Sequence, residues 1–241
     1  MNQDVAGPVV IHERFRGPDT SGNGGYSCGL IGREVEGPAS VSLRVPPPLE
    51  RPLELHSTGE GTLELRDGEV IVADGGPAEL KLDVPEAPSV EEAGEAVERF
   101  LFWHDHPFPG CFVCGPGRAY PDGLRIFPGQ VEGRAIVAAP WIPDAGLAGE
   151  NGSLSPELIW AVLDCPTSFG SALLGLAGTS VLARLTAEVV GAVRPGEPHV
   201  VVGWPIGREG RKSEGGSAIF TAGGELLARA KGLWIELKQE G

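Results

Sequence analysis

The sequence predicts an α+β fold in which many short antiparallel strands accompany a few helices. Apolar and polar residues alternate in short runs, Gly and Pro separate these runs, and one order of elements occurs twice. Each copy consists of a strand, a helix and then a series of strands, although no stretch recurs residue for residue. The 37 Gly and 22 Pro residues lie between the periodic runs, so they indicate turns and not disorder.

The first copy begins with a strand over 9–15, after which a turn-rich segment leads into a short helix over 26–35. Gly37 and Pro38 end this helix. Ser89 and Glu92 have the spacing of a capping box, which predicts a further helix over 89–103 that packs across the end of this copy. Between the two helices, period-two runs predict strands over 40–45, 53–57, 62–66, 69–73 and 78–84.

The second copy contains the longest predicted helix, over 155–174. Ser155 suits the N-cap, Pro156 suits the first helical position, and Glu157 complements the helix dipole in the first turn. Strands are predicted around this helix over 123–127, 134–141, 180–193, 198–207, 213–222 and 225–237. We expect an N-terminal unit over 1–103, a Pro- and Cys-rich linker over 104–122 and a C-terminal unit over 123–241.

The composition excludes several classes of function. A net charge of -14 argues against nucleic-acid binding, because such binding depends on Lys and Arg side chains that neutralise phosphates. The sequence has no apolar run near the roughly 18 residues that a membrane helix needs, and its N-terminus lacks a signal-peptide pattern. Four cysteines are too few for a disulfide scaffold in 241 residues. We therefore expect a cytoplasmic protein that binds neither nucleic acid nor membranes.

Asp164 is the one charged residue after the first turn of the otherwise apolar helix over 155–174. Burial of an unpaired carboxylate is costly, so Asp164 should be hydrogen-bonded, protonated or beside a cleft. Pro166 lacks a backbone N–H, so we expect the helix to bend there and to expose Asp164 to a ligand. The alternative is a structural Asp that satisfies the turn broken by Pro166.

A Gly-rich helix start is the second candidate feature. Asn23, Gly24 and Gly25 precede the short helix of the first copy, where free N–H groups attract a carbonyl oxygen or an anion. Glycines also let a ligand approach the backbone closely. A simple tight turn explains the same residues, so both interpretations stay open.

These residues and their surroundings resemble the hotdog-fold thioesterase superfamily. The phrases GPDTSGNGGYSCGL and VSLRVPPPLERPL are similar to the N-terminal half of double-hotdog acyl-CoA thioesterases. In the second half, CFVCGPGRAYPDGLRIF, IWAVLDCPTSFGSAL and REGRKSEGGSAIFTAGGELLARAKGLWI resemble the Cys-rich segment, central helix and last hairpin of single-unit members. The resemblance implies a double hotdog, in which two curved antiparallel sheets each wrap a central helix.

The resemblance also implies one composite site. In the phenylacetyl-CoA-type branch, a Gly-Gly pair opens the helix and an Asp lies eight residues after the first glycine. One helix of this chain keeps Asp164 but has Pro156 and Glu157 at the glycine positions. The other helix keeps the glycines at 24 and 25 but has Gly32 at the acid position. Because the losses are complementary, the acid of one half would face the helix start of the other.

The activity that the resemblance implies is hydrolysis of an acyl thioester without a cofactor. N–H groups near Gly25 and Tyr26 would stabilise the oxyanion, and Asp164 would act as general base or nucleophile. Asn23 would hold the attacking water or the carbonyl. The alternatives are a protein that binds acyl-CoA or a lipid thioester without hydrolysis, and a structural or interaction protein. Association into a homo-oligomer stays an open expectation.

Further residues are candidates for contact with substrate or metal. Trp141 and Trp160 flank the second helix start together with Glu157 and could line an acyl pocket, or could simply belong to the core. A basic run could contact an anionic carrier or form only a hairpin turn; it comprises Arg208, Arg211 and Lys212. A short motif in the linker has the ligand types of a zinc site, unless it is only a Pro-stiffened connection; it comprises His104, His106, Cys111 and Cys114.

Overall fold

The computed structural model describes residues 3–4, 7–149, 151–175 and 178–238, and within them the chain forms three α-helices and one antiparallel sheet. The helices are α1 (Gly24–Gly32), α2 (Val90–Val97) and α3 (Pro156–Ala172). The strands are β1 (Gln3–Asp4), β2 (Val9–Val10), β3 (Ala39–Leu43), β4 (Pro52–Gly59), β5 (Thr62–Asp67), β6 (Val70–Pro77), β7 (Gly129–Gln130), β8 (Val137–Trp141), β9 (Ser180–Val189), β10 (His199–Glu209), β11 (Lys212–Thr221) and β12 (Leu226–Glu236). Their order in the sheet is β1-β4-β5-β6-β3-β9-β12-β11-β10-β8-β7, and β2 pairs with β4.

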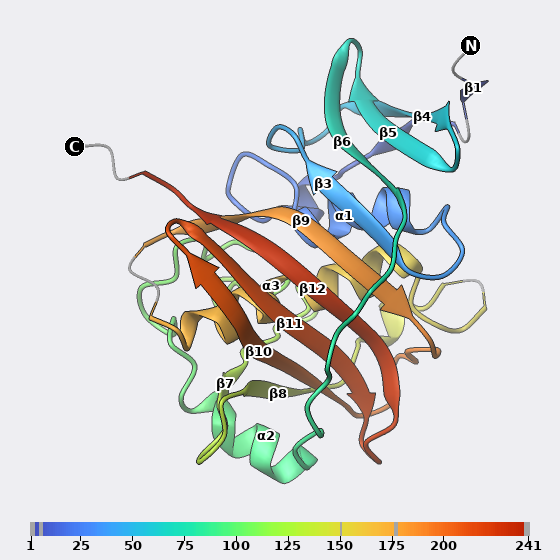
Figure 1. The fold of residues 1–241 in the computed structure, drawn as a ribbon. Coiled ribbons are helices and arrows are strands. Elements are labelled where there is room, and N and C mark those ends of the chain that lie inside the picture. The colour runs from blue at the N-terminus through green and yellow to red at the C-terminus, as the bar shows by residue number, and fades with distance from the viewer. Residues whose placement is uncertain (1–2, 5–6, 150, 176–177, 239–241) are drawn as a thin grey trace.

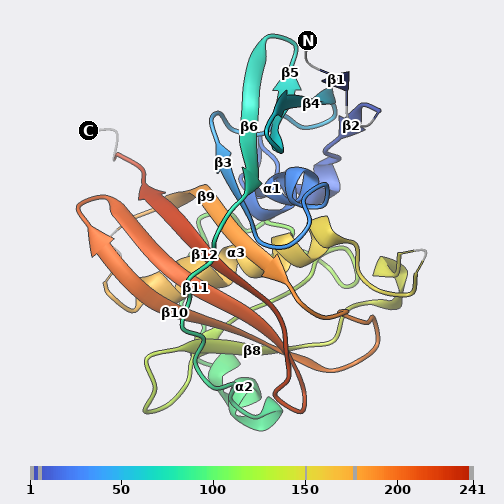
Figure 2. The same cartoon turned by 45° about the vertical axis from the view of Figure 1, so that its right-hand side comes forward.

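The two copies of the sequence pattern form the two halves of this sheet. Strand β3 of the first half pairs with β9 of the second, and at this seam Ala39 lies opposite Ala187. The hydroxyls of Ser40 and Thr186 are hydrogen-bonded across it at 2.8 Å. In Figures 1 and 2, α1 lies against the strands of the first half and α3 against the longer strands of the second. Where the resemblance implied two sheets, the described strands therefore form one continuous sheet.

Most predicted elements are present. The runs at 40–45, 53–57, 62–66 and 69–73 form β3 to β6, and the last four predicted strands form β9 to β12. The long helix is α3, and it continues through Pro166 without interruption. The capping box at α2 is confirmed, because the Ser89 side chain accepts from the Glu92 N–H at 3.1 Å and the Glu92 carboxylate accepts from the Ser89 N–H at 2.7 Å.

Two predicted strands are wrong, at 78–84 and 123–127. The first of these crosses the face of the sheet (Figure 1), since the neighbouring strands β6, β3 and β9 already have both edges paired. In the second, the N–H groups of Leu124 and Ile126 donate to the carbonyls of Phe112 and Val113. This segment therefore pairs with a loop and not with the sheet.

Several helix and strand bounds also differ from the predictions. The strand expected over 9–15 is reduced to β2 and a 3₁₀ turn at Glu13–Phe15, and α1 begins at Gly24, two residues early. Helix α2 ends at Val97 and packs against β7 and β8 of the second half, not across the end of the first. Small residues allow this contact, because Ala93 and Ala96 are fully buried in an apolar cluster with residues of β8 and β10. None of the helices in the described part of the chain is long and apolar enough to cross a membrane.

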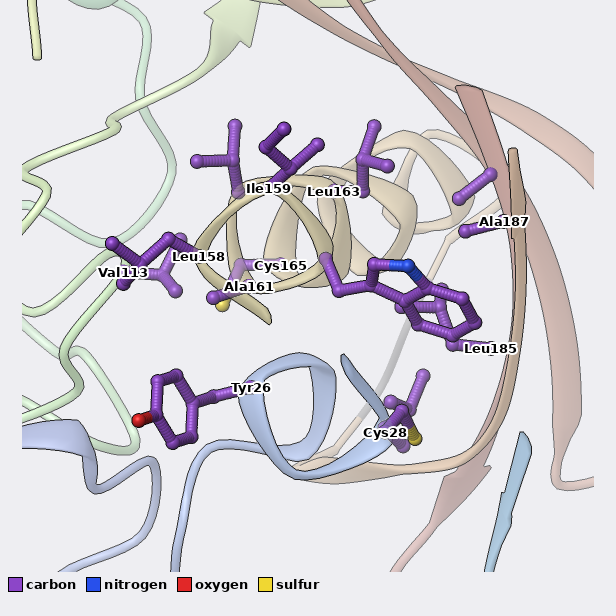
Figure 3. Packing of buried hydrophobic residues seen from close by; sticks show 14 of the residues in the cluster. Tyr26, Cys28, Val113, Leu158, Ile159, Ala161, Leu163, Cys165, Leu185 and Ala187 are labelled. Atoms are coloured by element: carbon purple, nitrogen blue, oxygen red, sulfur yellow. The ribbon is translucent and has the colours of Figure 1, made fainter. Parts of the chain in front are cut away.

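Helices α1 and α3 pack directly on each other at the centre of the molecule. Figure 3 shows Tyr26 and Cys28 of α1 below α3, with Ala161 of α3 on the side that faces them and Leu185 of β9 beside Cys28. These residues belong to one buried apolar cluster that includes residues of both halves. The core is therefore shared, and the two helices fix the position of one half relative to the other.

Three glycines make this close approach possible. Gly25, Gly29 and Gly32 lie on one face of α1, since three- and four-residue spacing repeats each helical turn. A Cβ atom on Gly25 would lie 2.5 Å from the carbonyl oxygen of Trp160, and one on Gly29 would lie 2.5 Å from the Cα of Glu157. Gly32 lies under the Trp160 indole, which a Cβ atom would overlap. The glycines of α1 thus serve helix packing as well as any ligand.

Candidate active site

Asp164 meets the N-terminus of α1 inside the molecule. Its side chain is almost fully buried, and Oδ2 accepts hydrogen bonds from Asn23 Nδ2 at 2.8 Å and from the Gly25 N–H at 2.9 Å. Asn23 is the N-cap of α1, and its Oδ1 accepts from the Tyr26 N–H at 2.9 Å. The acid from one half therefore lies at the helix start of the other. It does not satisfy the turn at Pro166, since Thr167 donates there to the Asp164 carbonyl.

The second carboxylate oxygen of Asp164 differs from the first in its hydrogen bonding. Oδ1 is buried and has no hydrogen-bond partner among the described residues. Burial raises the pKa of Asp164 from 3.8 to about 7, the Gly25 and Asn23 hydrogen bonds oppose this rise, and nearby Cys111 adds to it. Asp164 therefore titrates near neutral pH, as a general acid or base needs to do.

A cleft of about 830 Å³ begins at these residues. Asn23, Gly24 and Asp164 are among its polar lining residues. Its apolar lining comes from both halves and from the segment before the Cys pair, and includes Leu43, Phe102, Phe108, Phe169, Leu182 and Trp234. This size and lining suit a small organic ligand with an apolar group and one polar end.

The N–H groups expected to hold an oxyanion are partly in use. The Gly25 N–H donates to Asp164 and the Tyr26 N–H to Asn23. The Tyr26 ring stacks on Phe15 with centroids 4.2 Å apart and lies outside the cleft lining. Gly24 lines the cleft, and its N–H is at the first position of α1, where the helix itself supplies no acceptor.

Several other predicted contact residues lie away from this cleft. Trp160 covers Gly32, and Trp141 packs in β8 with its ring centroid 6.0 Å from that of His199. Glu157 packs against Gly29, and its carboxylate lies 3.8 Å from the Arg33 guanidinium. None of these three side chains is among those that line the cleft.

The basic run is also outside the cleft lining. Arg208 pairs with the Glu236 carboxylate at 2.9 Å, and Arg211 donates to the Glu236 carbonyl at 3.0 Å. Lys212 begins β11 after a hairpin turn in which Gly210 has a φ of 56°. The run therefore has the hairpin geometry of the structural alternative, and the charge of Arg208 is already paired.

The Cys pair of the linker has an additional neighbour. Cys111, Cys114 and Cys165 are buried, and their sulfur atoms lie within 4.8 Å of one another. They form the one group with metal-ligand spacing found among the described residues. His104 is exposed, and neither histidine of the predicted set joins this group. The four residues of the candidate zinc motif therefore do not form one group.

Sequence reasoning missed the contributions of Phe102, Phe108 and Cys165 to this region. Phe108 was part of the segment interpreted as a linker, although aromatic residues among prolines are unusual in a solvated connection, and Phe102 was placed in the predicted helix over 89–103. Cys165 follows Asp164 directly, yet 50 residues separate it from Cys114, so no local spacing connects them. Only the packing of α3 shows the three sulfur atoms together.

Solved structures show where this fold occurs, whereas no family model and no curated protein matches the chain. The tesB protein of Mycobacterium avium subsp. paratuberculosis has a TM-score of 0.64 at 15% identity, covering 98% of this chain and 96% of its own. The acyl-CoA thioesterase II TesB2 of Mycobacterium marinum has a TM-score of 0.61 at 12% identity, covering 100% and 97%. A conserved protein of unknown function with a hotdog fold from Alicyclobacillus acidocaldarius has a TM-score of 0.62 at 11% identity, covering 99% and 96%.

These likenesses confirm the hotdog fold that the sequence predicted, without the division into two separate sheets. At identities of 15% or less they show the architecture alone, and that architecture is the hotdog fold. The chain is therefore a hotdog-fold protein over nearly its whole length.

Proposed function

We propose that this chain hydrolyses acyl thioesters, such as acyl-CoA, at one composite site between two hotdog halves. The observation that supports it best is the buried carboxylate of Asp164, a residue of the cleft wall whose Oδ1 has no hydrogen-bond partner among the described residues. Oδ2 is held by the helix start of the other half, so the orientation of Oδ1 is fixed. In this proposal the two halves form a double hotdog with one working site.

The reaction follows from the roles of these atoms. Oδ1 of Asp164 removes a proton from water, whose oxygen attacks the thioester carbonyl carbon. The oxyanion that forms is stabilised by the N–H of Gly24 and by the positive end of the α1 dipole. Collapse of this intermediate breaks the C–S bond, and the thiolate takes the proton back from Asp164, giving a carboxylic acid and a thiol. Direct attack by Oδ1 on the carbonyl carbon is the alternative first step.

The lining of the cleft favours an apolar or aromatic acyl group. Phe108, Phe169 and Trp234 offer ring surfaces to such a group. The charged lining residues are mainly acidic, and Arg44 is already paired with Asp74. Phosphates of a carrier would therefore lie outside the cleft, in contact with solvent.

We expect this protein to act in the cytoplasm.

Binding without hydrolysis is the second candidate function. The engagement of the Gly25 and Tyr26 N–H groups favours it, because only Gly24 remains to hold an oxyanion. Thiol release from short, long and aromatic acyl-CoA thioesters distinguishes the two when equilibrium binding is measured on the same samples. Turnover supports the hydrolase, whereas saturable binding without thiol release supports the binding protein. An absence of both would contradict the proposed function.

The pH dependence of turnover is expected to follow the ionisation of Asp164. Only the ionised carboxylate acts as a base, so kcat/KM should fall about tenfold for each pH unit below about pH 7 and level off above it. Initial rates from about pH 5 to about pH 9 with one acyl-CoA measure this profile. A flat profile over this range would exclude a base with the raised pKa of Asp164.

A further inference from the structure

Three cysteines from two distant segments meet in the wall of the same cleft. Cys111 and Cys114 lie in a turn before the second half, and Cys165 follows Asp164 in α3. Each is exposed by 6% or less, and all three residues line the cleft. Cys28, the fourth cysteine, is buried in α1 and hydrogen-bonds to the Val41 carbonyl, so it is separate from this group.

The spacing of the sulfur atoms suits a shared metal ion better than a disulfide. Two thiolates on tetrahedral zinc, at about 2.3 Å from the metal, lie about 3.8 Å from each other. The Cys111 and Cys165 sulfur atoms are 3.9 Å apart, and the third lies within 4.8 Å of both. A disulfide of about 2.05 Å would require this pair to approach by about 1.9 Å. A metal ion would require little movement.

The backbone around the first two cysteines is already folded tightly. The N–H of Gly115 donates to the Cys111 carbonyl at 2.9 Å, which closes the turn around both sulfur atoms. A Cβ atom on Gly115 would lie 2.6 Å from both the nitrogen and the oxygen of Cys111, so the turn requires glycine there. The third sulfur is held by α3. Three ligand atoms are therefore in place before any metal binds.

The fourth coordination position would face the cleft. His106 also lines the cleft, but its Nδ1 accepts a hydrogen bond from the Phe108 N–H at 2.9 Å. In a neutral imidazole this leaves the proton on Nε2, which then has no lone pair for a metal. His106 is therefore not a ligand in this arrangement, and the open position is left for water or for a sulfur or nitrogen atom of a bound molecule.

We propose that Cys111, Cys114 and Cys165 bind one thiophilic metal ion of the zinc type, with its fourth position open to the cleft. The inference goes beyond the proposed hydrolysis, because it needs neither Asp164 nor a thioester. The plainest alternative is that three small side chains fill the core as free thiols. The metal site and the free-thiol alternative differ in whether the full chain binds a metal ion.

Titration of the full, reduced and metal-free chain with Zn²⁺ tests the proposal. We expect one tight equivalent per chain and a higher melting temperature, since binding to the folded state alone stabilises it. Replacement of Zn²⁺ by Co²⁺ should give the sulfur-to-metal charge-transfer absorption of a three-thiolate site. Cys111→Ser, Cys114→Ser and Cys165→Ser should each weaken binding by about 100-fold or more, because each removes a ligand.

Cys28→Ser is the matched control, since it replaces a buried cysteine outside the group and should leave metal binding unchanged. Absence of a tight equivalent in the wild type would overturn the proposal, and this result does not depend on any variant folding. Equal loss of binding in Cys28→Ser would overturn it as well. A third result would also overturn it. This result is that the reduced protein takes up no Zn²⁺, while oxidised glutathione converts two of the three cysteines into a disulfide with the loss of two hydrogens per chain.

The metal site and the hydrolase can fail separately. Asp164→Asn should retain the Zn²⁺ equivalent and the Co²⁺ absorption, because Asp164 is not one of the ligands. A wild-type chain that binds Zn²⁺ but releases no thiol from any acyl-CoA would therefore count against the hydrolase alone. A wild-type chain that releases thiol but binds no Zn²⁺ would count against the metal site alone.

Discussion

Asp164→Asn is expected to lower kcat for thioester hydrolysis by about 10²- to 10⁴-fold while acyl-CoA affinity changes little. An amide oxygen can accept the hydrogen bonds from Asn23 and Gly25, so the helix contact is preserved. The amide nitrogen takes the place of Oδ1 and has no basic lone pair. Thiol release under saturating substrate, with binding measured on the same protein, tests this expectation. Unchanged turnover would remove Asp164 from the mechanism.

The same variant should be more stable than the wild type above neutral pH. Between 3.8 and about 7 the folded state of the wild type holds a proton on Asp164 that the unfolded state has lost. Stability from this group is therefore present at low pH and decreases as pH rises to about 7. The pKa of Asp164 differs by about 3 units between the folded and unfolded states, so above about pH 7 the wild type has lost about 4 kcal/mol of its free energy of unfolding through this group.

Urea unfolding of both proteins at about pH 4 and about pH 8 measures this term. The advantage of Asp164→Asn should be larger at the higher pH, because only there does the wild type bury a charge. Asp83→Asn changes an exposed carboxylate and serves as the control. An equal difference between the proteins at both pH values would contradict the raised pKa of Asp164.

Gly25→Ala is expected to destabilise the fold by about 3 kcal/mol or more. The new Cβ would lie 2.5 Å from the Cβ of Asp164 and 2.5 Å from the Trp160 carbonyl oxygen. The second of these is a backbone atom inside α3, so the helices themselves would have to separate. Separation would also lengthen the Gly25 hydrogen bond to Asp164, so both stability and turnover should decrease.

Gly94→Ala is the matched control for this substitution. Gly94 lies inside helix α2, its φ is not positive, and a Cβ atom there would meet nothing within 4 Å. Alanine is favoured over glycine in a helix by about 1 kcal/mol, so this variant should be as stable as the wild type or more so. If urea unfolding gave the same free energy for both alanine variants, the close approach of α1 and α3 would be wrong.

The sequence made the acid and the helix start predictable because each breaks a local rule. Asp164 is a charge in an apolar helix, and Gly24 and Gly25 open a helix with poor helix formers. The resemblance then predicted that Asp164 of one half lies at the helix start of the other. The sequence did not show that Gly25 already donates to Asp164, because this depends on how closely α1 and α3 approach.

The remaining differences have causes that local patterns do not contain. The segment 78–84 alternates like a strand, but the neighbouring strands leave no free edge for it. Helix α2 has a well-defined start, but the surface on which it packs depends on Ala93 and Ala96, which are buried against the second half. Trp160 was a candidate for the acyl pocket, but its indole covers Gly32 of α1 instead.

The pairing of β3 with β9 connects parts of the chain that are made far apart in time. The Gly25 N–H, which donates to the Asp164 carboxylate, lies 139 residues earlier in the chain. The site can therefore form only after the C-terminal half has been synthesised and has docked on the N-terminal half. Either half made alone would carry only part of the proposed site. If the chain is the proposed hydrolase, its turnover would report correct docking of the halves.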